Sequence, residues 1–467
     1  MHLRLTGEWP KDVPPNGSEN MPPDWMKFTD RLDRNEVRRV ARERRSLPPD
    51  REFDRVITAP PYEATVDLWY PQRPAGMAAV IIREAAGLKQ PYLIESVFIR
   101  YCAGAAGEMV TRQFVHYLDR SYLYVDELDG DALFVLADVT RRVGLMFGEH
   151  EKRLDALLAE LAVDPFLERY RDTICSRAHT CPVCSADVTP VGDNHITKLY
   201  RGGELGRKLL AEGYETITDV PEERLPLPGQ RIQRATLLSR KPHIDADGLT
   251  RFLESISYPL HYLDFEAVSS AVPRYDGTHP WEHIPYLFSV HTETAPGDRL
   301  THQWFLMDPH RDQRRELLRS LLGALGGDGT VLVYGAAFEA GILARLAETF
   351  PEKSTAVEDV AGRMVDLLQP FNEFAYYHHT QRGKVRLKTV LPILTDENYS
   401  DLVVRDGYAA NSVYRYLSSR AEDTAAVALT DDLVRYCTRD TLAMVRIVGE
   451  LRDIVARPQR GRSRSEP

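Results

Sequence analysis

Cysteine is scarce in this sequence, with five residues in a chain of 467. So few thiols in a chain of this length do not form the disulfide framework of a small secreted protein. Long apolar runs are also lacking, since no stretch approaches the roughly 18 residues that a membrane helix needs. The N-terminal residues are polar and rich in proline, without the apolar core of a signal peptide. We therefore expect a cytoplasmic protein that has no membrane partner.

An excess of positive charge is absent as well, because 69 acidic residues outnumber 59 basic ones and the formal net charge is −10. This balance argues against a protein that passively coats nucleic acid, which needs a basic surface. Hydrophobic residues make up 43% and charged residues 27% of the chain, as in ordinary globular proteins. These values are compatible with an enzyme whose basic groups are local and whose acidic groups hold a metal.

Composition and hydrophobic periodicity divide the chain into five segments. Residues 1–24 are predicted to be a flexible arm, and the charged, serine-rich residues 457–467 a disordered tail. Residues 25–185 and 245–456 each mix strand and helix patterns. They are therefore predicted to be two α/β domains, joined by a small helical connector at residues 186–244.

The first of these domains has a clear central strand in the apolar run Ala78–Ile82, and residues 121–125 read as a further strand. Apolar residues recur at helical spacing from Tyr92 to Tyr117, which predicts one long helix. The domain is expected to end at a group of cysteines.

That group contains three thiols within ten residues. They are Cys175, Cys181 and Cys184. Closely spaced soft ligands are what zinc and iron–sulfur clusters require, so either could bind here. Cys102, His179 or His195 could supply a fourth ligand. The alternative is three free cysteines in a small loop.

The stretch His261–Glu266 places two acidic residues in an apolar strand pattern. Its apolar residues favour a buried strand, and side chains two apart in a strand point to the same face. Asp264 and Glu266 therefore project side by side. Two like charges repel at that distance, and a hard cation such as Mg²⁺ or Mn²⁺ would cancel the repulsion. The alternative is a strand end at which water solvates both acids.

Two later segments add to this acidic group. Glu339 lies at the start of a predicted helix that follows the buried strand pattern of residues 330–334, so it can turn back toward the strand ends. Tyr436 and Asp440 are four apart in a predicted helix and share one face. Acids from three separated segments can surround two metal ions roughly 4 Å apart.

These three segments resemble the sequence motifs of the DEDD exonuclease superfamily, the DnaQ-like branch of the RNase H-like fold. Asp264-Phe265-Glu266 is similar to the first motif, Val333–Glu339 to the second and Tyr436–Asp440 to the third. The resemblance implies a 3′–5′ exonuclease with two Mg²⁺ or Mn²⁺ ions. Its ligands would be the four acids of the motifs, and Tyr436 would orient the attacking water.

The second motif departs from the family pattern. Glu339 stands where aspartate is usual, and Gly335 where asparagine is frequent. Because glutamate is longer by one methylene group, the ligand geometry would have to adjust. Asp366 is a substitute or auxiliary ligand, or alternatively a helix-capping or surface acid.

The chain further resembles an uncharacterised bacterial family that joins this exonuclease-like domain to an N-terminal RecB-like nuclease domain of the PD-(D/E)XK type. The resemblance is strong over residues 245–452 and weak over residues 25–244. Asp67 resembles the metal-binding aspartate, but the next strand reads Ile81-Ile82-Arg83 where an acid and a lysine are needed. We therefore expect a degenerate, restriction-endonuclease-like α/β domain without catalysis. Members of that family tend to carry an iron–sulfur cluster that uses an N-terminal cysteine, which is missing here.

A basic segment follows the second motif, with Arg382, Lys384, Arg386 and Lys388 at every second position. If this segment were extended, the four cations would face one side at roughly 7 Å spacing and could follow a nucleic-acid backbone. The alternative is a solvated loop followed by a helix that begins near Lys388.

The sequence as a whole predicts a metal-dependent 3′–5′ exonuclease that hydrolyses DNA or RNA from a single-stranded end. The alternative is a nucleic-acid-binding or scaffolding protein whose sites have decayed. Intact acids in all three C-terminal motifs favour the enzyme.

Overall fold

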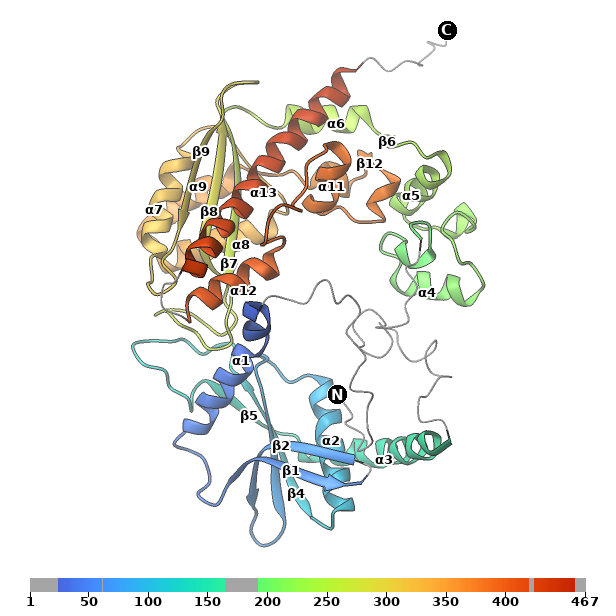
Figure 1. Ribbon diagram of the computed structural model, residues 1–467, viewed down its shortest axis with the longest axis vertical. Coiled ribbons are helices and arrows are strands. Elements are labelled where there is room, and N and C mark those ends of the chain that lie inside the picture. Colours follow the sequence, from blue (N-terminus) through green and yellow to red (C-terminus); the bar gives the residue numbers. More distant parts are fainter. Residues whose placement is uncertain (1–23, 61, 164–191, 420–423, 458–467) are drawn as a thin grey trace. The chain divides into compact units, whose positions relative to one another are not determined.

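The computed structural model describes most of the chain as a mixed α/β protein (Figure 1). The described residues are 24–60, 62–163, 192–419 and 424–457. Nearly all of the predicted arm and tail, together with the three clustered cysteines, lie outside these residues. No described helix is both long and apolar enough to cross a membrane.

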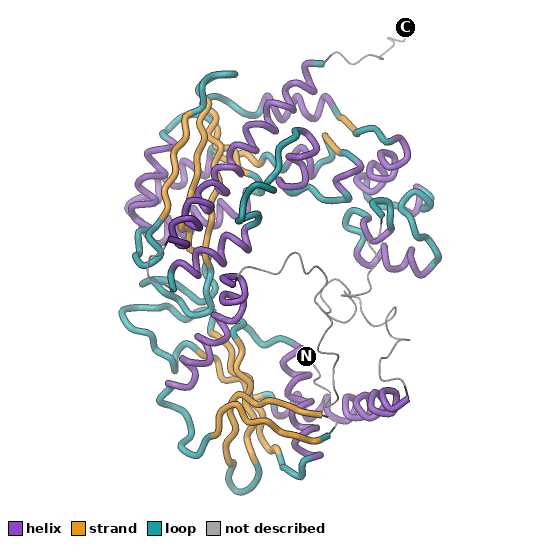
Figure 2. The backbone as a smooth tube through the Cα atoms, viewed as in Figure 1, coloured by secondary structure: helices purple, strands orange, loops and turns teal. Residues whose placement is uncertain are grey.

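The chain divides into two compact units. Unit 1 comprises residues 1–189 and 269–282, and unit 2 comprises residues 190–268 and 283–467. Each unit contains one five-stranded mixed sheet, which Figure 2 distinguishes from the surrounding helices. The finer division into five segments stays a prediction.

The sheet of unit 1 follows chain order. Its strands are β1 (Glu52–Ala59), β2 (Tyr62–Pro71), β3 (Met77–Arg83), β4 (Val110–Leu118) and β5 (Phe134–Asp138). β3 and β4 are parallel, and the other neighbours are antiparallel. The helices are α1 (Asp24–Glu43), α2 (Gln90–Ala105) and α3 (Thr140–Val163). The strand predicted at residues 78–82 is confirmed as β3.

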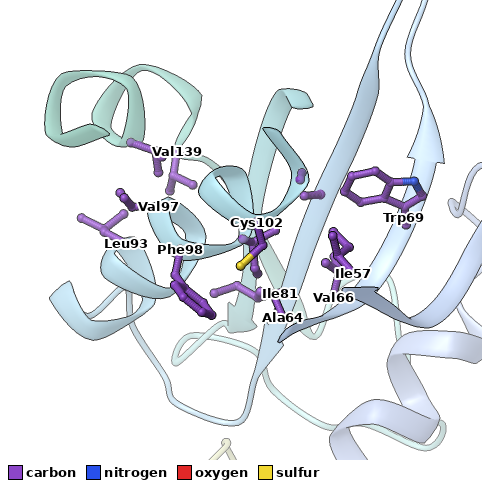
Figure 3. Close-up of a cluster of buried hydrophobic side chains, with 14 of the residues drawn as sticks. Ile57, Ala64, Val66, Trp69, Ile81, Leu93, Val97, Phe98, Cys102 and Val139 are labelled. Atoms are coloured by element: carbon purple, nitrogen blue, oxygen red, sulfur yellow. The ribbon is translucent and has the colours of Figure 1, made fainter. Parts of the chain in front are cut away.

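A core of apolar side chains fills the space between this sheet and helix α2 (Figure 3). Val66 and Ile81 contribute from the strands, and Val97 and Phe98 from α2. Cys102 is fully buried among them, and this burial raises the pKa of its thiol to about 12. The Cys102 thiol is therefore part of an apolar core.

Two predictions for unit 1 were wrong. The helix expected from Tyr92 to Tyr117 ends at Ala105, because Gly107 takes a positive φ of 78° and the β-branched residues that follow form β4. Residues 121–125 form the end of a turn, an irregular stretch and one isolated bridge instead of a strand. Asp119 fixes the turn, since its carboxylate accepts hydrogen bonds from the Ser121 amide and hydroxyl at 2.8 and 2.7 Å.

The sheet of unit 2 has the strand order β11-β10-β7-β8-β9. Its strands are β7 (Leu260–Val268), β8 (Ile284–Glu293), β9 (Thr301–Leu306), β10 (Thr330–Val333) and β11 (Met364–Asp366). β7, β8 and β9 are antiparallel, whereas β10 runs parallel to both β7 and β11. The strands predicted around His261–Glu266 and at residues 330–334 are confirmed as β7 and β10.

Helices precede, separate and follow these strands in the chain. They are α6 (Ala246–Glu254), α7 (Arg314–Leu325), α8 (Ala337–Thr349), α9 (Ser354–Gly362), α10 (Gln369–Asn372), α11 (Leu387–Leu394), α12 (Gly407–Leu417) and α13 (Thr424–Ala456). The long helix α13 packs on β7 and β8, along which Figure 1 shows it running. α7 packs on β8 and β9. The central strand β7 is therefore flanked by the helix that carries the third motif.

The predicted connector contains α4 (Gly203–Ala211) and α5 (Pro228–Ser239), which pack around a small apolar core of their own. The two-residue strand β6 (His243–Ile244) follows and pairs with β12 (Tyr376–Tyr377). These residues belong to unit 2. Residues 269–282, which link β7 to β8, instead belong to unit 1, where Ala271 and Val272 enter an apolar cluster.

Candidate metal centre

The first part of the site lies on strand β7. Apolar residues on either side of the acids hold this strand in the core, with Tyr262, Leu263 and Phe265 all buried. Asp264 is opposite Ser289 and Glu266 is opposite Leu287 on β8, so both acids lie on one face of the sheet. Glu266 is buried and Asp264 is half-buried, which excludes the solvated strand end as an account of this pair.

Helix α13 supplies the second part of the site. Tyr436 and Asp440 lie one helical turn apart on the same face and are both buried. The next residue, Thr441, anchors the helix to β8, since its hydroxyl lies 2.9 Å from the Ser289 hydroxyl and 2.8 Å from His291 Nδ1. This buried polar contact sets the position of α13 along the strand.

Together β7 and α13 bring three carboxylates to one point. One oxygen from each of Asp264, Glu266 and Asp440 lies within 4.8 Å of the other two. Hard divalent cations such as Mg²⁺ and Mn²⁺ prefer carboxylate oxygens, and three convergent ones are a suitable donor set. The residues present thus fit a divalent metal ion.

The pKa values of these three acids are all raised, because burial and mutual repulsion disfavour their ionised forms. Burial, followed by the charges of Asp440 and Glu266, raises the pKa of Asp264 well above its ordinary value. Burial and the Asp440 charge raise the pKa of Glu266 to about 8. Burial also raises the pKa of Asp440, against the opposing effect of Lys388. A bound cation would relieve this repulsion and stabilise the ionised carboxylates.

A lysine and two tyrosines surround Asp440. The Lys388 ammonium donates a hydrogen bond to the Tyr436 hydroxyl, and it lies 4.0 Å from Asp440 Oδ2. The Tyr399 hydroxyl donates to Asp440 Oδ1 at 2.5 Å. The Cys437 thiol donates a hydrogen bond to Asp264 Oδ2 at 3.3 Å. Each of the two aspartates is therefore held by a neighbouring hydrogen-bond donor.

Glu339 is close to the group of three acids but is not part of it. It lies in the first turn of α8 and is buried, and burial raises its pKa to about 7. Its charge also raises the pKa of both Asp264 and Glu266. Its Oε2 atom has no hydrogen-bond partner within the described part of the chain. A buried carboxylate oxygen without a donor is suited to a cation, so Glu339 is available as a further ligand.

Asp366 serves as a cap for the chain between β10 and α8. Its carboxylate accepts hydrogen bonds from the backbone amides of Gly335 at 2.8 Å, Ala336 at 3.0 Å and Leu368 at 2.9 Å. Both oxygens are thus occupied by the backbone. Of the two alternatives that the sequence left open, the capping acid is the one observed, and it fixes the turn that leads to Glu339.

The basic segment does not form the extended row of four cations, which was one of the two alternatives that the sequence left open. Arg382 ends a short 3₁₀-helix with a positive φ of 52° and forms an ion pair with Asp193 at 2.7 Å. Lys384 and Arg386 are exposed in a loop, whereas α11 begins at Leu387 and turns Lys388 toward the acids. The loop-then-helix alternative is the observed one. A role of this segment in nucleic-acid binding stays a prediction.

In unit 1, Asp67 is engaged by arginines. It is buried on β2 and forms ion pairs with Arg38 and with Arg83, the latter at 2.7 Å. The Ile82 amide also donates to it at 2.8 Å. Two guanidinium groups thus neutralise the carboxylate that the sequence compared with a metal-binding aspartate. The expectation that this domain lacks catalysis stays a prediction.

Two residues that contribute to the site were not among those predicted from the sequence. Tyr399 and Cys437 had no assigned role, and no spacing or composition signal distinguished them from core residues. Lys388 had been assigned to nucleic-acid binding, yet it also contacts the third motif.

Comparison with known proteins gives a limited match. A family model described as a domain of unknown function (DUF2779) matches residues 261–386. Searches of curated proteins and of solved structures each returned no significant match. The matched span contains Asp264, Glu266 and Glu339 and ends before Lys388, Tyr436 and Asp440.

Proposed function

We propose that this protein is a metal-dependent 3′–5′ exonuclease that hydrolyses phosphodiester bonds of DNA or RNA, with its site in unit 2. The observation that carries the proposal is the convergence of Asp264, Glu266 and Asp440 within 4.8 Å beside a buried tyrosine. The strand order of unit 2 supports it, because three antiparallel strands followed by two parallel ones is the arrangement of the RNase H-like fold.

The proposed ligands divide between two metal ions. Asp264, Glu266 and Asp440 would hold the first ion, and Asp264 with Glu339 would help to hold a second. When bound, divalent cations supply positive charge to the phosphate oxygens and favour ionisation of the attacking water. The raised pKa values of these acids are consistent with a site that is completed by cations.

The residues of the chain itself would orient the reactants. The Tyr436 hydroxyl, held by Lys388, hydrogen-bonds to the attacking water and directs its oxygen toward phosphorus. As the new phosphorus–oxygen bond forms, the bond to the 3′ oxygen of the preceding nucleotide breaks. A 5′-mononucleotide leaves, and the shortened strand keeps a 3′ hydroxyl. Tyr399 keeps the Asp440 carboxylate in place throughout.

Degradation of end-labelled single strands in Mg²⁺ or Mn²⁺ tests the proposal. With a 3′ label we expect early release of labelled mononucleotide, and with a 5′ label a ladder that shortens gradually. Asp264→Asn and Asp440→Asn should each lower the single-turnover rate by roughly a hundredfold or more, because each removes a ligand charge from the site. Asp67→Asn is the matched control, a buried acid of unit 1 whose loss should leave the rate unchanged.

Two results would contradict the proposal. Wild-type protein that binds strands but never cleaves them, in either metal, would favour the decayed binding protein. Cleavage that survives Asp264→Asn but not Asp67→Asn would assign the chemistry to unit 1. Parallel assays on DNA and RNA of the same sequence identify the preferred substrate.

A further inference from the structure

Lys388 occupies an unusual place for a lysine. It lies in the first turn of α11, half-buried, with its ammonium 4.1 Å from the ring centre of Tyr436 and 5.0 Å from that of Tyr399. Two aromatic rings that flank a cation attract it and restrict its movement. The ammonium is therefore held at one point beside Asp440.

The start of α11 is itself tied to the sheet. The Tyr334 hydroxyl, at the end of β10, donates a hydrogen bond of 2.5 Å to the carbonyl of Val385. Lys388 follows three residues later, so the sheet that carries the acids also sets the position of the lysine. A surface lysine that follows a nucleic-acid backbone would need no such anchoring.

The hydrogen bond between Lys388 and Tyr436 has a direction. An ammonium can only donate, so the Tyr436 oxygen must accept, and the hydroxyl proton has to point away from the lysine. Donation into the oxygen also strengthens the hydrogen bond that the hydroxyl itself donates. Lys388 thus restricts the Tyr436 hydroxyl proton to the side away from the ammonium, where Tyr436 also hydrogen-bonds to Asp440, and makes the hydroxyl a better donor.

The same ammonium is a positive charge among carboxylates. It lies 4.0 Å from Asp440 Oδ2 and opposes the charges of Glu266 and Asp440. A metal ion bound to Asp440 would be repelled by it at this distance. The lysine therefore weakens metal binding while it orients the tyrosine, which a purely structural residue would not do.

We propose that Lys388 is a positioning residue of the site, which orients the Tyr436 hydroxyl for the attacking water from a place where its charge competes with the metal. This role rests on the proposed exonuclease activity. The role differs from binding to the nucleic-acid backbone, which the alternating cations of residues 382–388 suggested.

A double-mutant cycle tests the coupling to Tyr436. In single-turnover cleavage at saturating substrate, Lys388→Met and Tyr436→Phe should each lower the rate roughly tenfold. Adding Lys388→Met to Tyr436→Phe should lower it less than about threefold further, because the group through which the lysine acts is already gone. Lys388→Arg should recover part of the rate. Lys208→Met is the control, because this lysine is exposed on α4 and has no part in the site, so the rate should not change.

A calorimetric Mn²⁺ titration supplies a readout that needs no catalysis. Lys388→Met should bind Mn²⁺ at least about threefold more tightly than wild type, because the competing charge is removed. Weaker Mn²⁺ binding by this variant, or an equal rate loss with and without the Tyr436 hydroxyl, would overturn the inference.

The two proposals can fail separately. Wild-type protein that binds Mn²⁺ but cleaves no strand overturns the exonuclease and, with it, the orienting role of Lys388. The Mn²⁺ titration then still decides whether the lysine competes with the metal. Active wild-type protein with additive effects of the two substitutions overturns the role of Lys388 alone.

Discussion

Replacing Asp264 by asparagine should stabilise unit 2 in the absence of metal and abolish its response to Mn²⁺. Oxygens of Asp264, Glu266 and Asp440 lie within 4.8 Å of one another. At that distance an ionised pair repels with roughly 3 kcal/mol in an effective dielectric constant of 20. Protonation of Glu266, whose pKa is about 8, already relieves part of this repulsion near neutral pH. We therefore expect Asp264→Asn to raise the free energy of unfolding by about 1–2 kcal/mol in EDTA.

Bound Mn²⁺ should reverse the order of stability of wild type and Asp264→Asn. A ligand that binds only the folded state at a hundred times its dissociation constant stabilises by about 2.7 kcal/mol. Wild-type protein should gain this amount in Mn²⁺, whereas Asp264→Asn should gain little. Wild type would then become the more stable protein in metal and remain the less stable one in EDTA.

Amide hydrogen exchange is the suitable assay, because it reports opening free energies for β7 and α13 without contributions from unit 1. Asp366→Asn is the control, since this acid caps backbone amides and its loss should destabilise the unit with or without metal. If Asp264→Asn were less stable than wild type in EDTA, the three carboxylates would not be in electrostatic conflict. A cation would then have no electrostatic conflict to relieve at this point.

Three further predictions concern pH, unit 1 and the cysteines. The pKa of Glu266 rises from 4.5 to about 8 in the folded protein, so metal-free stability should fall as pH increases through this window, while calorimetric Mn²⁺ affinity should increase. Asp67→Ala should destabilise unit 1 by about 3 kcal/mol, because two arginines lose their partner. Hydrogen exchange in β2 and β3 should then be faster, whereas the cleavage rate should not change. Anaerobically purified protein should carry about one zinc or show iron–sulfur absorbance. Either signal should disappear when Cys175, Cys181 and Cys184 are changed to serine. Metal analysis that finds neither zinc nor iron would remove this site.

Much of the acidic site could be predicted from local sequence rules. The two-residue period of a strand put Asp264 and Glu266 on one face, and the helical period did the same for Tyr436 and Asp440. Both relations depend only on backbone geometry, so they hold wherever the elements lie in the fold. The apolar residues around them were enough to identify a buried strand and a long helix.

The distance between these elements could not be predicted in the same way. That α13 packs on β7 at the height of Asp264 depends on contacts far apart in sequence, such as those of Thr441 with Ser289 and His291. The same is true of Tyr399, whose contact with Asp440 spans 41 residues. No periodicity or composition encodes such pairs.

The sequence by itself thus determined which faces carry the acids, and tertiary packing decided what stands opposite them. The clearest example is Lys388, for which the sequence allowed an extended row of cations or a helix. Two aromatic rings and an acid from two other segments hold it in the site, and only the folded chain brings these together. Likewise, Asp67 carries the residue type of a metal ligand, but the folded chain places two guanidinium groups on it. Residue type fixes the charge that a position contributes, whereas the neighbours supplied by the fold decide whether that charge meets a metal or an arginine.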